Sequence, residues 1–234
     1  MNKEAVVYLI PAPLSDDGLQ AIHPYCLEAI RQCSDFFVEN ERTTRRYFKQ
    51  LWKEMIIDDY GWYTIHKTET DCVTIFRDMM RAGKTVGIVS EAGCPGIADP
   101  GQLLVAAAQD MKAVIKPLVG PNSILLALMA SGFNGQRFNF RGYLPIDNQE
   151  KIRQLKAFES ESVKRETTQI FIETPYRNNQ LIDALLQNCQ PDTRLCIAVD
   201  LTGEKEWIRT LPLKEWKLQK PDIHKIPAIF LLMA

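Results

Sequence analysis

The chain has 234 residues, of which 46% are hydrophobic and 24% are charged. This composition is typical of a globular protein with a substantial core, in one large domain or two small ones. A formal net charge of -1 excludes a general attraction to nucleic acid or to an anionic membrane, so a nucleic-acid site must be a local patch. Its apolar runs are far shorter than the roughly 20 residues of a membrane-spanning helix, and no signal-peptide pattern is visible; we expect a cytoplasmic protein.

The first half of the chain alternates short apolar runs with helical patterns. Strands are predicted near residues 6–10, 36–38, 62–65, 85–89 and 113–118. Helices are predicted near residues 24–33, 42–52, 73–80, 101–109 and 122–131. Such alternation predicts a mainly parallel sheet with helices on both faces.

The pattern breaks at Gly132-Phe133-Asn134-Gly135, where we place the domain boundary. The predicted domains are therefore residues 1–132 and 136–234. The second domain has predicted strands near 137–143, 168–172, 194–200, 206–211 and 227–233, and helices near 150–160 and 177–187. Because its last strands follow one another with few helices between them, we expect a mixed sheet. The fold class is α/β in two domains.

Several common sites are excluded by spacing. The tripeptide Gly83-Lys84-Thr85 lacks the earlier glycine of a phosphate-binding P-loop, and it precedes a strand, where a P-loop would follow one. No G-x-G-x-x-G follows the first strand, so a dinucleotide fold of that kind is not indicated. The six cysteines form no C-x-x-C pair and the three histidines stand alone, which predicts neither a metal site nor a disulfide framework.

Three loops follow predicted parallel strands. They are Pro11-Ala12-Pro13, the glycine loop at residues 90–101 (SEAGCPGIADPG), and residues 119–123 (VGPNS). Ligands of open α/β sheets bind outside the carboxyl ends of the strands. Gly93 and its neighbouring glycines let the main chain approach a ligand closely, and Ser123 stands at a helix start, where it can cap the helix or bond a ligand. Together the loops predict one small-molecule site.

Four segments carry a resemblance to a known family: SEAGCPGIADPG, PLVGPNS, RFNFRGYLP and ETPYR (Glu173 to Arg177). Their order and spacing resemble the tetrapyrrole-methylase-like, class III S-adenosylmethionine methyltransferases. Within that family the chain is most similar to the bacterial small-subunit rRNA ribose 2′-O-methyltransferase I subfamily, whose glycine loop reads S-D-A-G-x-P-x-x-S-D-P-G.

The resemblance implies a homodimer of two-domain α/β subunits that holds S-adenosylmethionine in a cleft between the domains. By position, the residues implied to line this cofactor are Pro11, Gly93, Cys94, Ile97, Ser123 and Ile124 in the first domain, and Ala198 and Ala228 in the second. Cys94 replaces the Asp or Thr that relatives have there, which a main-chain contact tolerates.

Methyl transfer from a sulfonium depends mainly on holding the acceptor in line with the methyl group, and a base helps when the acceptor is a hydroxyl. Glu39 and Glu91, each just past a strand, are the candidate catalytic carboxylates. Residues 42–49 form a basic helix face in which Arg42 and Arg45 are candidate RNA-binding residues. A solvated helix face is the alternative interpretation.

One departure from the subfamily bears on the acceptor. Ser15-Asp16-Asp17 stands where relatives have Gly-Asn-Leu, and two carboxylates there would repel phosphate. The first hypothesis is methyl transfer to a ribose 2′-hydroxyl of RNA. The alternatives are a small-molecule acceptor such as a tetrapyrrole, and a protein that binds S-adenosylmethionine without catalysis.

Overall fold

The computed structural model describes residues 4–65 and 70–234, which divide into two compact units, Met1–Pro121 and Asn122–Ala234. The boundary expected at 132–135 lies one helix further along the chain than the observed boundary between Pro121 and Asn122. Helix α5 (Ser123–Ser131) packs on the sheet of the second unit, and its Ser131 carbonyl accepts a hydrogen bond from Thr210 Oγ1 at 2.8 Å. Gly132, at φ +72°, therefore ends a helix of the second unit and does not separate two domains.

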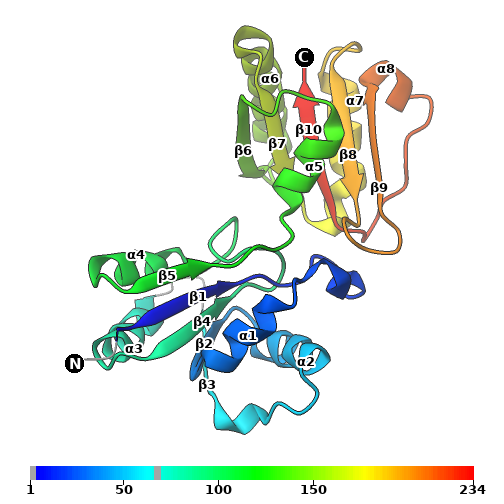
Figure 1. Cartoon of the computed structure of the whole chain (residues 1–234). Helices are drawn as coiled ribbons and strands as arrows, with labels where there is room; N and C mark the ends of the chain where they lie inside the picture. Colours follow the sequence, from blue (N-terminus) through cyan, green and yellow to red (C-terminus); the bar gives the residue numbers. More distant parts are fainter. Residues whose placement is uncertain (1–3, 66–69) are drawn as a thin grey trace. The chain divides into compact units, whose positions relative to one another are not determined.

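The first unit contains the predicted parallel sheet, in the order β3-β2-β4-β1-β5 (Figure 1). Every neighbouring pair in it is parallel. Its strands are β1 (Val6–Ile10), β2 (Asp35–Val38), β3 (Gly61–Thr64), β4 (Thr85–Val89) and β5 (Val114–Pro117). Among the described residues of this unit there are also two short 3-10 helices, η1 (Gly18–Ala21) and η2 (Ile57–Asp59).

Side-chain alternation along these strands gives the sheet two buried faces. Helices lie against both of them (Figure 1). Ile10 and Phe36 face the helices α1 (Tyr25–Gln32) and α2 (Glu41–Leu51). Val7 and Phe37 face α3 (Thr70–Arg81) and α4 (Gln102–Asp110). A sheet covered on both faces leaves the ends of its strands as the place where loops can form a site.

The second unit contains the mixed sheet, in the order β6-β7-β10-β8-β9. Only β6 and β7 pair in parallel; the other pairs are antiparallel. The strands are β6 (Phe138–Tyr143), β7 (Thr168–Ile172), β8 (Arg194–Val199), β9 (Trp207–Pro212) and β10 (Ala228–Met233). The α/β fold class with one parallel and one mixed sheet is thus confirmed.

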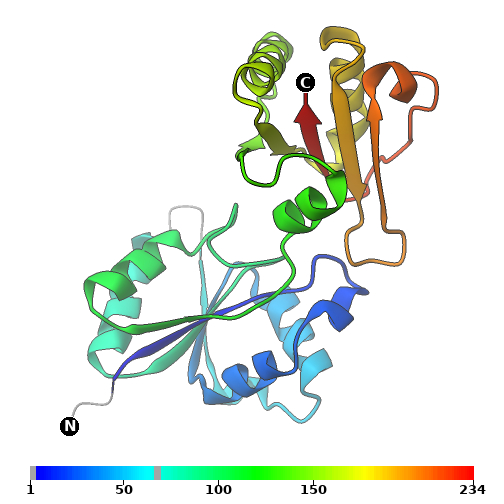
Figure 2. The same ribbon diagram turned by 45° about the horizontal axis from the view of Figure 1, so that its top comes forward.

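Helices cover both faces of this second sheet, as the view in Figure 2 also shows. On one face, Phe171 and Phe230 pack against α6 (Asn148–Arg165), α7 (Asn178–Asn188) and α8 (Leu213–Trp216). On the other face lies α5, which buries Ile124, Ala127 and Leu128. None of the described helices is both long and apolar enough to cross a membrane.

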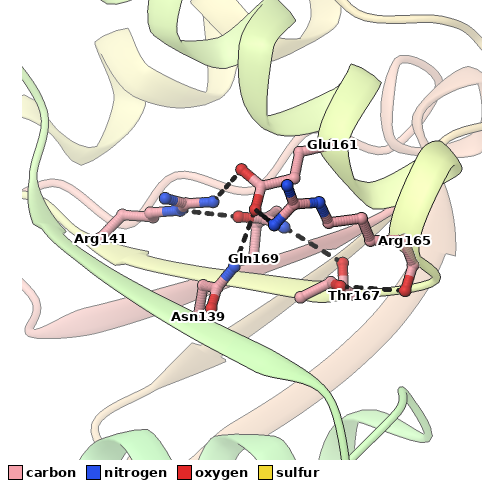
Figure 3. A network of polar contacts seen from close by, with 6 residues as sticks. All are labelled: Asn139, Arg141, Glu161, Arg165, Thr167 and Gln169. Carbon is pink, nitrogen blue, oxygen red and sulfur yellow. Dashed lines mark hydrogen bonds and ion pairs between the residues drawn. The ribbon is translucent and has the colours of Figure 1, made fainter.

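A polar network fixes the edge strand β6 to its neighbours (Figure 3). Arg141 donates to the fully buried Gln169 at 2.7 Å and forms an ion pair with Glu161 on α6. Asn139 donates to the same carboxylate at 3.0 Å. Helix α6 extends to Arg165, past the predicted end at residue 160, and this added turn places Glu161 over the strand.

Candidate active site

The three predicted loops of the first unit meet at one edge of its sheet. Ala12 and Gly93 form a pair of main-chain hydrogen bonds: the Ala12 N–H donates to the Gly93 carbonyl at 2.8 Å, and the Gly93 N–H donates to the Ala12 carbonyl at 3.0 Å. Gly120 lies so close to Pro11 that a side chain there would reach within 2.1 Å of the proline Cβ. The first loop therefore contacts both of the others.

The glycine loop keeps its shape through main-chain conformations that favour glycine. Gly93, Gly96 and Gly101 have φ angles of +73°, +76° and +121°. The buried hydroxyl of Ser90 donates to the Gly93 carbonyl at 3.1 Å, which holds the start of the loop against β4. Around Gly96 nothing lies within 4 Å of where a Cβ would be, so the main chain there is open to an incoming group.

The predicted cofactor-lining residues of this loop differ in exposure. The Cys94 Sγ lies 3.5 Å from the Pro121 carbonyl, which connects the glycine loop to the third loop. Ile97 is 49% exposed, and Pro11 is buried against Gly120. The loops thus bring Pro11, Gly93 and Cys94 together, with Ile97 on the open side of the same loop.

The remaining predicted cofactor residues belong to the second unit. Ser123 is the first residue of α5, but the residue that caps this helix is Asn122, whose Oδ1 accepts the Leu125 N–H at 3.1 Å. Ile124 is buried. The expected placement of Ser123 and Ile124 in the first domain is therefore corrected, because both are part of a helix that packs on the second sheet.

Ala198 and Ala228 lie on neighbouring strands, near the carboxyl end of β8 and the start of β10. Ala228 pairs with Val199 and Ala198 with Ile229. Because successive residues alternate between the faces of a sheet, the two alanine methyl groups point to opposite faces. A ligand that reaches both must do so at the strand ends, through the main chain.

Of the two predicted catalytic carboxylates, Glu91 belongs to the glycine loop and Glu39 lies beside it. The Glu39 carboxylate accepts the Glu91 N–H at 3.0 Å, and the Glu91 carboxylate accepts the side-chain amide of Asn40 at 3.3 Å. These contacts connect the tips of β2 and β4, where ligands of parallel sheets bind.

Asp99 is a third carboxyl group in this place, and sequence reasoning passed over it. Burial, followed by the negative charges of Glu39 and Glu91, raises the pKa of Asp99 to about 7. The A-D-P-G sequence at the end of the glycine loop could have pointed to Asp99. Its closeness to the other two carboxylates could not be predicted, because it depends on the folded path of the loop. Within the described part of the chain, no group of acidic, histidine or cysteine side chains is arranged to hold a metal ion.

The basic face of α2 is largely occupied by contacts within the chain. Arg45 forms an ion pair with Glu41 and lies over the Trp62 ring, with its guanidinium carbon 5.1 Å from the centroid. Lys49 caps main-chain carbonyls beyond the helix end, one of them that of Met55 at 3.0 Å. Arg42 is exposed to solvent.

Arg46, on the same helix, contacts the acidic first loop. Its guanidinium donates to Asp16 at 2.7 Å, and Asp17 accepts the Ser15 hydroxyl at 2.6 Å. The Asp16 charge is thus partly compensated, which weakens the argument that this loop repels phosphate.

Comparison with known proteins places this chain in a family. The sequence profile described as Tetrapyrrole (Corrin/Porphyrin) Methylases matches residues 7–217. The chain belongs to this family. It is therefore a methyltransferase, and such an enzyme needs a methyl donor, typically S-adenosylmethionine.

Curated relatives of this methyltransferase confirm the resemblance seen in its motifs. Over 217 residues it is 29% identical to "Ribosomal RNA small subunit methyltransferase I" of Vibrio cholerae, covering 92% of this chain and 71% of that protein. It is also 29% identical to the protein of the same name from Bacillus subtilis over 205 residues, which are 87% of this chain and 66% of the relative. The match thus spans about two thirds of the relatives' length.

Solved structures share the fold of this methyltransferase. Diphthine synthase superposes with a TM-score of 0.68 at 14% identity, covering 98% of this chain and 90% of that one. The methyltransferase CobJ superposes with a TM-score of 0.63 at 17% identity, covering 99% and 94%. At such identities the likeness establishes the fold alone.

Proposed function

We propose that this chain transfers a methyl group from S-adenosylmethionine to ribosomal RNA, with a ribose 2′-hydroxyl as the acceptor. The observation that carries the proposal is the convergence of the glycine loop with the loops at Pro11–Ala12 and Gly120–Pro121, in a chain of the tetrapyrrole methylase family. The names of the relatives supply the acceptor class.

The loop residues fit such a cofactor in shape and charge. The main chain at Gly96 is open to contact, and the main chain at Gly93 and Cys94 can approach the cofactor closely. Two carboxyl groups of the loop, Glu91 and Asp99, and one beside it, Glu39, suit a cationic sulfonium. When bound, S-adenosylmethionine would supply its methyl group to a nucleophile that attacks the methyl carbon in line and displaces S-adenosylhomocysteine. We assign its binding to Pro11, Gly93, Cys94, Ile97, Ser123, Ile124, Ala198 and Ala228.

Asp99 is our candidate for the group that accepts the proton of the acceptor hydroxyl. A general base works best when its pKa lies near the working pH, and Asp99, with a pKa of about 7, meets this condition. Glu39 and Glu91, the carboxylates indicated by the sequence, then act on Asp99 through their charges. In this assignment Asp99 accepts the proton, and the negative charge of Glu91 raises the pKa of Asp99.

This assignment predicts a particular pH dependence. Because a base must be ionised, kcat/KM of the wild type should rise as the pH increases through about 7. Glu91→Gln removes a negative charge that raises the pKa of Asp99, so its profile should be displaced to lower pH. Asp99→Asn should lower kcat by about a hundredfold or more and abolish the rise. Methylation rates measured across pH 5 to 9 test this.

The control for the pH profile is Glu54→Gln, which removes an exposed carboxylate elsewhere in the first unit. Its profile should coincide with that of the wild type. An unchanged midpoint in Glu91→Gln, or a full rate in Asp99→Asn, would reject Asp99 as the base.

The RNA acceptor remains a proposal supported by local charge. Arg42 is solvent-exposed at the start of α2, and Arg46 offsets the acidic first loop. We assign RNA contact to Arg42, and to Arg45 only if it leaves its ion pair with Glu41. Homodimer formation also stays a prediction from the family resemblance.

Incubation with S-adenosylmethionine labelled in its methyl group tests the function as a whole. The acceptors offered are ribosomal small subunits, free ribosomal RNA and a metabolite extract containing tetrapyrroles. We expect label in RNA, and in nucleosides modified at the ribose after digestion. Label in a small molecule alone would favour the tetrapyrrole alternative, and cofactor binding without any labelled product would favour the non-catalytic one.

A further inference from the structure

The segment after β7 carries an exposed aromatic ring. Tyr176 lies in η3 (Pro175–Arg177) and is 66% exposed. Two side chains from a distant segment lie against it. The Lys225 Nζ is 5.7 Å from the centroid of the ring, and the His224 ring lies at a centroid distance of 6.0 Å and an interplanar angle of 79°. We call Tyr176, His224 and Lys225 the Tyr176 platform.

Hydrogen bonds fasten the two segments of the platform to each other. The Lys225 N–H donates to the Pro175 carbonyl at 3.0 Å. The side-chain amide of Asn178, which is fully buried, donates to the Ile226 carbonyl at 2.7 Å. The ring is therefore presented by a preformed support, and a ligand that stacks on it need not order the loop first.

The charges around the platform leave one cation available. Asp222 accepts hydrogen bonds from the Asn179 amide at 2.8 Å and from the His224 N–H at 3.2 Å, and these two contacts lower its pKa. Its carboxylate is thus used to hold the loop. Across residues 4–65 and 70–234, no carboxylate forms an ion pair with Lys225.

The platform lies at the edge of the sheet where the proposed cofactor residues of the second unit also lie. β7 lies beside β10 (Figure 1) and ends at Ile172, and Ile172 pairs with Ile229, the residue after Ala228. Tyr176 follows that end, and Lys225 precedes Ala228 by three residues. The ring is thus near the strand ends to which we assign methyl-donor binding.

We propose that the Tyr176 platform binds the RNA substrate, with an unpaired base stacked on the Tyr176 ring and an adjacent phosphate paired with Lys225. This proposal rests on the proposed RNA acceptor. Single-stranded RNA is recognised through bases stacked on aromatic side chains and phosphates paired with cations, and the platform provides one of each on a fixed support.

Binding of a short fluorescent single-stranded RNA, followed by fluorescence anisotropy, tests the platform. Tyr176→Ala should weaken binding by about tenfold or more because it removes the stacking surface. Tyr176→Phe retains the ring and should bind within about twofold of the wild type. Lys225→Asn removes the cation and should weaken binding and its salt dependence, while asparagine tolerates the left-handed backbone at φ +64°.

Matched controls separate the platform from general effects. Phe138→Ala removes an exposed aromatic ring from the start of β6, and Lys217→Asn removes an exposed lysine from the end of α8. Both should bind RNA like the wild type. S-adenosylmethionine affinity and the circular dichroism spectrum, measured on every variant, report whether the fold is intact.

The outcomes distinguish a failure of the Tyr176 platform from a failure of the proposed RNA acceptor. If the wild type methylates RNA and both Tyr176→Ala and Lys225→Asn bind it with unchanged affinity, the platform is rejected and the RNA acceptor stands. Loss of affinity in Tyr176→Phe as well would reject stacking. An effect confined to intact small subunits, absent with free RNA, would reject the RNA contact in favour of a ribosomal protein. A wild type that neither binds nor methylates RNA rejects the acceptor itself.

Discussion

Gly93→Val should weaken S-adenosylmethionine binding by about ten- to a hundredfold in calorimetric titration. Valine at φ +73° strains the main chain by about 1–3 kcal/mol, and 1.4 kcal/mol corresponds to a tenfold change in affinity. The new Cβ would also lie 3.3 Å from the Leu14 side chain and 3.5 Å from the Pro121 carbonyl. The substitution therefore acts where all three loops meet.

Two variants make the Gly93 result specific. Gly135→Val places the same side chain where nothing lies within 4 Å of the added Cβ, and it should bind the cofactor like the wild type. Gly93→Asn should fall between wild type and Gly93→Val, because asparagine tolerates a positive φ. Equal affinity in all three variants would mean that the glycine loop is only a turn.

Arg177→Met should produce the largest loss of stability, about 3–5 kcal/mol in the free energy of unfolding of the second unit. The Glu173 carboxylate is fully buried, and Arg177 pairs with it at 2.6 Å. The second carboxylate oxygen has no hydrogen-bond partner, so the arginine is the group that balances the buried charge. Hydrogen exchange at the amides of β7 and β10 measures the opening of this unit by itself.

The matched control for Arg177 is Arg153→Met, which breaks an exposed pair with Glu150 on α6. Such a solvent-exposed pair contributes little to stability, so Arg153→Met should leave the free energy of unfolding nearly unchanged. The double variant Glu173→Leu/Arg177→Met should recover most of the lost stability, since no buried charge is left unpaired. Equal costs for Arg177→Met and Arg153→Met would contradict the view that Glu173 holds a buried charge.

Strand and helix positions could be predicted from the sequence because their apolar spacing is local. The division into units could not, since the glycine pattern at 132–135 resembles a linker while the burial of α5 depends on β8, β9 and β10. The last turn of α6 was missed because Glu161 and Arg165 are polar there and find their partners only in the folded unit.

Site residues that belong to one continuous motif could be predicted from the sequence. Contacts between residues far apart in the sequence could not. Gly93 and Cys94 could be identified because they belong to one continuous loop. The effect of Glu39 on Asp99 could not, because 60 residues separate them and the loop path brings them together. Likewise, no local pattern indicates that Lys225 lies against Tyr176.

The glycine loop is anchored at both ends, so the residues at its ends are constrained and those in its middle are free to vary. Ser90 and Ala12 hold Gly93, and Gly101 is the N-cap residue of α4, while Ile97 and Ala98 between them are exposed. A change at Ile97 would therefore alter the side chain assigned to the methyl donor without disturbing either anchor. Libraries randomised at this position alone would show how much of the affinity for the methyl donor depends on a side chain and how much on the anchored main chain.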